Sequence, residues 1–283
     1  MQKPVRISII SICIVLALGA FVGVGALGVR VGVRFKTYRL LFELGKREAM
    51  IAAFRQVLGL QKTHAESQQD LWIVLSAVPN KRDGYYVDVG SGDGVFVSNT
   101  KLLDDMGWKG ACIDPFPTNM SSRTCQLFRQ PVFSVSGKKV SFRAAGLLGG
   151  ITEPSGGASG GVGLAVDASG KVLAIQHPPL VDFSTATLDE ILEKAHAPRH
   201  IDFMSIDIEG AEYEALRGLS LDKYQVQAFV IEHNFEEPKR HLIRELLESK
   251  GYTLLRSWYW DDWYVLHDRP YRFKLVQEEL QPR

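Results

Sequence analysis

A glycine-rich turn is the strongest chemical feature of this sequence. It runs Asp88-Val89-Gly90-Ser91-Gly92-Asp93-Gly94 and directly follows a hydrophobic run that predicts a strand. Glycine lets the backbone pass close to a ligand, and open α/β sheets bind ligands at the carboxyl ends of their strands. The turn lacks the third glycine of the Gly-x-Gly-x-x-Gly dinucleotide fingerprint. It therefore favours an adenosyl ligand without a pyrophosphate over NAD.

A second acid, Asp114, ends the next predicted strand. It follows Asp88 by about 26 residues, close to the offset at which such folds place a carboxylate on ribose hydroxyls. A carboxylate accepts two hydroxyl donors, and Pro115 and Pro117 would fix the turn beneath the adenosine. The alternative is an aspartate that caps a helix.

The elements that must position these residues alternate between strands and helices. Strands are predicted over residues 85–89, 110–114, 201–206 and 228–231, and helices over 98–106, 187–192 and 239–249. This alternation is typical of a parallel sheet with crossover helices. Strands over 252–255 and 263–266, joined by a turn at Asp261-Asp262, predict a closing antiparallel hairpin. The glycine-rich stretch 146–170 predicts a mobile loop or irregular hairpin over one sheet end; we expect an insertion there rather than a substrate lid.

Four blocks occur in an order that resembles the FkbM family of S-adenosylmethionine (SAM)-dependent methyltransferases. They are residues 67–70, residues 86–94 with Ser98-Asn99-Thr100, residues 107–115, and residues 201–212, which contain Asp207-Ile208-Glu209-Gly210-Ala211-Glu212. The resemblance covers about residues 64–268. It departs at Asp114, where many relatives carry Glu, and both acids can hold a ribose.

The resemblance implies an α/β fold with a seven-stranded, mostly parallel, Rossmann-like methyltransferase sheet whose last strand is antiparallel. It also implies SAM as the cofactor and O-methylation of a hydroxyl on a sugar, lipid or small metabolite. The expected cofactor-binding residues are Asp88, Gly90, Ser91, Gly92, Asp93, Gly94, Asn99, Asp114 and Pro115.

Methyl transfer to a hydroxyl needs an aligned nucleophile and a base that takes the proton. The expected catalytic residues are Asp207, Glu209 and His233, which lie at or after the ends of predicted strands. We expect His233 or Asp207 to be the base and Glu209 to position cofactor or acceptor. Glu212 lies one turn further on, where an acid simply favours the helix dipole.

No resident metal is expected. As an alternative, Asp207, Asn234 and one further acid resemble the oxygen ligands with which catechol-type methyltransferases hold Mg²⁺. Zinc is not expected, because Cys112 and Cys125 lack nearby histidines at metal-binding spacing.

The N-terminal segment from Ile7 to Val29 carries no charge and is long enough to cross a hydrocarbon core. It predicts one transmembrane helix preceding the catalytic domain, rather than a cleaved signal peptide. The basic residues that follow it favour a cytosolic catalytic domain. The predicted organisation is an anchor over 1–34, a juxtamembrane helix or linker over 35–63, a methyltransferase domain over 64–270, and a tail over 271–283.

Composition limits the partners. The formal net charge is +1, so nucleic acid is not favoured as a partner. Three cysteines leave one soluble pair, Cys112 and Cys125, and favour a reducing compartment. The Asn119-Met120-Ser121 sequon is expected to be unused. The expected partners are the membrane, through the N-terminal helix, and a small-molecule or glycolipid acceptor.

Two other functions remain open. One is a non-catalytic, membrane-tethered interaction or trafficking protein that keeps the fold, since the FkbM group also resembles trafficking proteins of the Star type. The other is a nicotinamide-dependent oxidoreductase, which the glycine spacing disfavours. The aromatic residues between 258 and 264 are expected to pack in the core rather than to line a substrate pocket.

Overall fold

The computed structural model of the chain describes residues 63–78, 81–152, 162–167 and 170–266. Every described residue belongs to the unit Leu60–Arg283. The predicted anchor, most of the juxtamembrane segment and the tail lie outside the described residues. Within the described ranges, no helix has both the length and the apolar character needed to cross a membrane.

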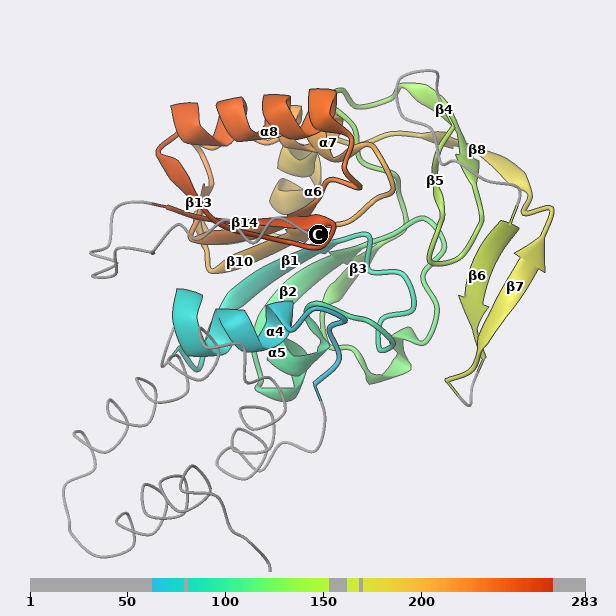
Figure 1. Ribbon diagram of the computed structural model, residues 1–283, viewed down its shortest axis with the longest axis horizontal. Helices are drawn as coiled ribbons and strands as arrows, with labels where there is room; N and C mark the ends of the chain where they lie inside the picture. The colour runs from blue at the N-terminus through green and yellow to red at the C-terminus, as the bar shows by residue number, and fades with distance from the viewer. Residues whose placement is uncertain (1–62, 79–80, 153–161, 168–169, 267–283) are drawn as a thin grey trace, which may run out of the picture. The chain divides into compact units, whose positions relative to one another are not determined.

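A seven-stranded sheet forms the centre of this unit (Figure 1). Its strands lie in the order β13 (Tyr252–Trp258), β14 (Asp261–Leu266), β12 (Ala228–Glu232), β10 (Phe203–Ile206), β1 (Tyr85–Val89), β2 (Lys109–Ile113) and β3 (Gln126–Phe128). The strands from β12 to β3 are parallel, and β14 is antiparallel to both of its neighbours. The seven-stranded, mostly parallel sheet is therefore confirmed.

Helices cover both faces of the sheet, as hydrophobic strands buried on both sides require. Figure 1 shows α6 (Leu188–Lys194), α7 (Glu212–Arg217) and α8 (Glu237–Ser249) on one face, and α4 (Gln69–Trp72) and α5 (Lys101–Asp105) on the other. A π-helical turn, Ile73–Ala77, continues α4, and Met120–Ser122 form a 3₁₀ turn. Helix α5 begins later than predicted because the Ser98 hydroxyl accepts the backbone N–H of Lys101 at 3.1 Å.

The closing hairpin is present, but its predicted turn was wrong. Asp261 and Asp262 are the first residues of β14 and pair with Glu232 and Ile231 of β12. Both aspartates are buried, and each has a hydrogen-bond partner that offsets the cost of burial, Gln69 for Asp261 and Arg240 for Asp262. Asp262 accepts hydrogen bonds from Nε and Nη2 of Arg240, at 2.8 and 2.9 Å.

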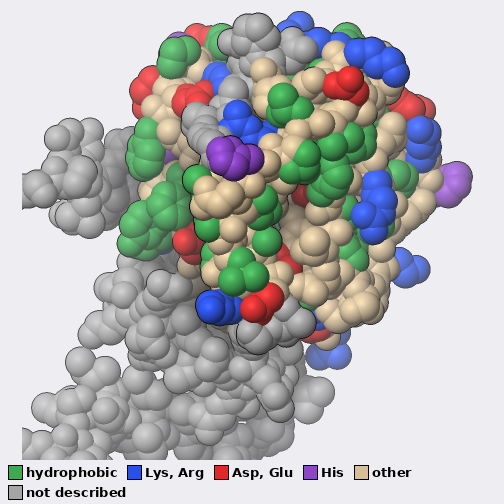
Figure 2. All heavy atoms as spheres, turned by 90° about the vertical axis from the view of Figure 1, so that its right-hand side faces the viewer, with side chains coloured by type: hydrophobic (Ala, Val, Ile, Leu, Met, Phe, Trp, Pro, Cys, Tyr) green, Lys and Arg blue, Asp and Glu red, His purple; other side chains and the backbone are tan. Residues whose placement is uncertain are grey.

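The glycine-rich region, predicted as a mobile loop or irregular hairpin, contains regular strands on both sides of its undescribed residues. The strands β4 (Lys139–Arg143), β5 (Gly150–Ile151) and β8 (Leu180–Ser184) form an antiparallel sheet, and β6 (Val162–Val166) pairs with β7 (Val172–Gln176). A short parallel pair, β9 (His200–Ile201) and β11 (Gln225–Val226), lies elsewhere. Figure 2 faces the side that carries this insertion and shows hydrophobic side chains gathered there.

Cys112 and Cys125 form a disulfide, with their Cα atoms 5.7 Å apart. The bond joins the middle of β2 to the residue before β3. Disulfides persist mainly in oxidising compartments. The pairing therefore counts against the reducing compartment that the cysteine count favoured.

Helix α4 is held on the antiparallel strand β14 by one polar and one aromatic contact. The Gln69 amide Nε2 donates to Asp261 Oδ2 at 2.6 Å, and the Trp72 and Trp263 ring centroids lie 4.8 Å apart. Burial, followed by the charge of Asp207, raises the pKa of Asp261 to about 7. The folded protein therefore favours protonated Asp261, which contributes its full stabilisation below the unfolded pKa of 3.8. This stabilisation is lost as the pH rises through 7.

Asp261→Asn should therefore flatten the pH dependence of stability. Asparagine can still accept from Gln69 but cannot ionise, so the free energy of unfolding should fall less steeply between about pH 4 and 7, by up to about 1.4 kcal/mol per pH unit. Denaturant unfolding of the full chain at several pH values measures this slope. Asp222→Asn, at an exposed position, is the control, and equal slopes for wild type and Asp261→Asn would contradict the prediction.

Candidate functional site

A cavity of about 470 Å³ opens where the carboxyl ends of β1, β2, β10 and β12 meet. This volume is in the range of small-molecule sites. From β1 the chain adds β2 and β3 on one side and later β10 and β12 on the other, and open α/β sheets bind ligands at such a switch in strand order. Eight of the nine predicted cofactor-binding residues line the cavity: Asp88, Gly90, Ser91, Gly92, Asp93, Asn99, Asp114 and Pro115. The ninth, Gly94, is not among the lining residues.

The glycines of the turn have different roles. Gly90 has φ +88°, and a Cβ there would lie 1.7 Å from the backbone oxygen of Asp207, so only glycine lets β1 and β10 approach at this point. Gly92 has φ +48°, and its Cβ would meet nothing closer than Leu147 at 3.6 Å. The space beside Gly92 is therefore available to a ligand. A Cβ at Gly94 would lie 2.5 Å from Met120 Sδ, which makes that glycine a packing residue.

Asp114 and Ser91 present polar atoms to this space. Asp114 accepts backbone N–H groups from Gly92 at 2.9 Å and Phe116 at 2.7 Å, one on each carboxylate oxygen. Each oxygen keeps a second lone pair, which suits two neighbouring hydroxyls. The Ser91 hydroxyl is buried without a hydrogen-bond partner. These features fit the ribose and the polar groups of SAM.

The charge of the cavity also suits a cation. Seven acids line it: Glu66, Asp88, Asp93, Asp114, Asp207, Glu209 and Glu232. Among its described lining residues there is no lysine, arginine or histidine. Such a cavity favours a positively charged ligand, and the sulfonium of SAM carries that charge.

Three of the predicted cofactor residues shape the turn rather than offer free groups. Asp88 accepts from Thr100 Oγ1, and Asp93 accepts the Phe96 N–H at 2.9 Å and the Thr118 hydroxyl at 3.0 Å. The amide of Asn99 donates to the Ser205 hydroxyl at 2.9 Å. The Asn119 amide of the sequon also donates to Asp93.

The two predicted catalytic acids, Asp207 and Glu209, lie together with Glu232, which was not predicted, on the other side of the cavity. Asp207 follows β10, Glu209 lies in the next turn with φ +57°, and Glu232 ends β12. One carboxylate oxygen from each of the three lies within 4.8 Å of the others. Burial, then the charges of Asp207 and Glu212, raise the pKa of Glu209 to about 7.

The structure does not bring His233 into the cavity. Successive residues of a strand point to opposite sides, and here Glu232 and Asn234 line the cavity whereas His233 does not. The His233 Nδ1 accepts the backbone N–H of Phe235 at 3.0 Å, and Nε2 lies 3.6 Å from Asp262. Burial lowers the pKa of His233, which favours the neutral ring.

Glu212 stabilises the acidic turn, residues 207–210, through hydrogen bonds to its backbone. It is buried at the first position of α7, and its Oε1 accepts the backbone N–H groups of Ile208 at 3.1 Å and Gly210 at 2.9 Å. Glutamate at this position therefore fixes the loop that carries Glu209, beyond any effect on the helix dipole.

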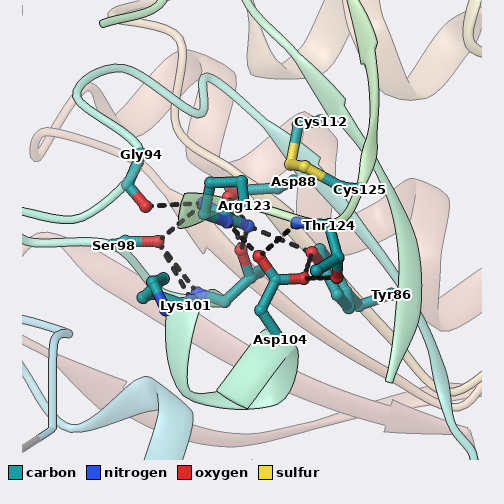
Figure 3. The surroundings of a disulfide bond; sticks show 11 residues. Tyr86, Asp88, Gly94, Ser98, Lys101, Asp104, Cys112, Arg123, Thr124 and Cys125 are labelled. Carbon is teal, nitrogen blue, oxygen red and sulfur yellow. Dashed lines mark hydrogen bonds and ion pairs between the residues drawn. A yellow bond between two sulfur atoms is a disulfide. The ribbon is translucent and has the colours of Figure 1, made fainter. Parts of the chain in front are cut away.

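Sequence reasoning missed Arg123, whose side chain is 1% exposed and lies below the glycine turn. Figure 3 shows its guanidinium directed at Asp88 and Asp104. It also donates to the Gly94 carbonyl at 2.8 Å and to Thr100 Oγ1 at 2.6 Å. One cation thus joins β1, the turn and α5, and the adjacent Cys112–Cys125 disulfide fixes the segment that carries it. A lone arginine in an irregular segment gives no periodic signal.

The comparisons with known proteins agree with this geometry. The family model described as the methyltransferase FkbM domain matches residues 88–254, more than half of the chain. This range begins at Asp88 and includes the glycine turn, Asp114 and the acidic cluster. The search of curated proteins found no match, and neither did the search of solved structures.

Arg123→Met should destabilise the domain strongly. The change leaves the buried carboxylates of Asp88 and Asp104 without their cation, which costs about 3–5 kcal/mol. Urea unfolding of the full chain measures the loss. Arg217→Met is the matched control, because that half-exposed side chain pairs with Glu214 on the surface and should cost less than about 1 kcal/mol. Similar losses in the two variants would contradict the role given to Arg123.

Proposed function

Because the chain belongs to the FkbM methyltransferase domain family, we propose that it transfers the methyl group of SAM to a hydroxyl on a sugar, lipid or small metabolite. One observation carries the proposal. Asp114 stands beside the open space at Gly92, in a cavity lined by seven acids. A ribose-binding carboxylate and an anionic cavity are what an adenosyl sulfonium requires.

Bound SAM supplies a methyl carbon on a positively charged sulfur; transfer joins that carbon to the acceptor oxygen, breaks its bond to sulfur and releases the hydroxyl proton. Asp114 would hold the ribose, and Ser91 would bond a polar group of the cofactor. Asp207 and Glu209, across the cavity, would orient the acceptor and take its proton. His233 has no part in this arrangement.

The insertion gives the cavity an apolar wall. Leu147, Leu148, Ile151, Leu164 and Val172 line the same space as the acids. Val162, Val172, Leu173 and Leu180 are exposed hydrophobic residues of the insertion. An acceptor that joins a hydroxylated head to an apolar part, such as a glycolipid, would match both surfaces.

We propose that residues 7–29 tether the domain to a membrane, on the length and lack of charge of that segment. Two observations bear on the side that the domain faces. The basic residues after the segment favour the cytosol. The Cys112–Cys125 disulfide favours an oxidising compartment.

Asp114→Ala should weaken SAM binding by about 1.5–3 kcal/mol, the range for hydrogen bonds to a charged group. Calorimetry on the detergent-solubilised full chain measures this, with NAD as the rival ligand and the exposed Asp182→Ala as control. Unchanged SAM affinity in a folded Asp114→Ala protein would contradict the cofactor site.

Methyl incorporation from labelled SAM into membrane glycolipids and hydroxylated metabolites then tests turnover. Tight SAM binding without any acceptor would favour the non-catalytic, membrane-tethered alternative.

Removal of residues 1–34 should release the protein from membranes, because 7–29 is the one uncharged run of spanning length in the sequence. Carbonate extraction compares the truncated and full chains, and a truncated protein that stays in the pellet would contradict a single anchor.

Thiol labelling of membranes that carry the full chain reports the compartment. We expect Cys112 and Cys125 to react only after reduction, whereas labelling without reductant would support the cytosolic side.

A further inference from the structure

The acidic cluster has the composition of a cation site. Asp207 follows β10 and Glu232 ends β12, which are neighbouring parallel strands, and Glu209 lies in the turn between β10 and α7. Their nearest oxygens lie within 4.8 Å of one another. Opposite ligands of a bound ion are separated by twice the metal–oxygen distance, which is about 4.0–4.2 Å for Mg²⁺ and about 4.6–5.2 Å for Ca²⁺, so carboxylates this close can reach one ion.

A second observation points to a missing ligand. Glu232 is only 6% exposed and lines the cavity, yet its Oε2 has no hydrogen-bond donor among the described residues, and the one side chain that it approaches as a partner is another acid, Asp207. Buried polar atoms are nearly always bonded. A cation that enters from the cavity would satisfy this oxygen together with the two neighbouring carboxylates.

The described basic side chains near the cluster are already engaged. Lys239 donates to the Gly210 carbonyl at 2.8 Å and pairs with Glu236, and Arg240 pairs with Asp262. The three carboxylates lie close together, so their like charges repel one another. A divalent cation would remove the repulsion.

The donor set selects the class of ion. All three ligands are carboxylates, and the Asn234 side chain, whose Nδ2 lies 3.5 Å from Glu209 Oε2, offers an amide oxygen nearby. Neither a histidine nor a cysteine belongs to the cluster among the described residues. Oxygen ligands suit Mg²⁺, Mn²⁺ and Ca²⁺, whereas zinc sites use nitrogen and sulfur.

We propose that Asp207, Glu209 and Glu232 bind one divalent cation, Mg²⁺ or Mn²⁺, which holds an oxygen of the methyl acceptor. The role on the acceptor rests on the proposed methyltransferase function, whereas the cation site stands on the cluster alone. The ion would lie across the cavity from Asp114, so cofactor and acceptor would be held by different carboxylates. Each ligand needs only one of its two oxygens for the ion, so the second oxygen of Asp207 or Glu209 would still take the proton of the acceptor hydroxyl.

Mn²⁺ is the probe, because its electron paramagnetic resonance signal falls when it binds. The detergent-solubilised full chain should bind about one Mn²⁺, and added Mg²⁺ should displace it. Glu209→Gln, at a half-buried position with little risk to folding, should weaken Mn²⁺ binding at least about tenfold. Asp114→Asn, an equal loss of charge in the same cavity, should change Mn²⁺ affinity by less than about twofold while it weakens SAM binding.

The outcomes separate the two proposals. SAM binding without Mn²⁺ binding at about 1 mM, the weak end of protein sites, would overturn the cation site and leave the proposed function intact. Mn²⁺ binding without SAM binding would do the reverse. Equal losses of Mn²⁺ affinity in Glu209→Gln and Asp114→Asn would also overturn the site, because they would show a response to total charge rather than to three ligands.

Discussion

A single buried guanidinium holds the glycine-turn side of this cavity in place. Arg123 lies between Asp88 and Asp104 and also bonds the carbonyl of Gly94, so one side chain fixes a strand, a turn and a helix together. Buried ion pairs are strong constraints because each partner is costly to leave alone. The shape of the glycine turn, and with it the space at Gly92, depends on this contact.

Close approach of two strands provides the second constraint. With glycine at position 90, the turn after β1 passes against the backbone of Asp207, and the Asp207 N–H donates to the Val89 carbonyl at 2.9 Å. This contact brings the cofactor turn and the acidic turn to opposite sides of one small cavity. The glycine thereby links the two halves of the site, although it offers no side chain for chemistry.

The carboxylates of the cavity stand in two different environments, Asp114 in one and the cluster of Asp207, Glu209 and Glu232 in the other. Asp114 has its oxygens arranged by two backbone N–H groups, as a fixed hydrogen-bond acceptor should. Glu232, by contrast, has an oxygen with no hydrogen-bond donor among the described residues and stands with Asp207 and Glu209. The same functional group thus stands in two different surroundings, and the different ligands that we propose for Asp114 and for the three clustered acids follow from this difference.

The sequence by itself determined the parts that depend on local pattern. The strand at 85–89, the glycine turn and Asp114 were found where the structure has them, because hydrophobic runs and glycines report on their own neighbourhoods. Tertiary structure decided the rest. β12 is buried on both faces, so periodicity could not tell whether Glu232 or His233 faces the cavity. Arg123 meets Asp88 across 35 residues of chain, a contact that no local spacing encodes.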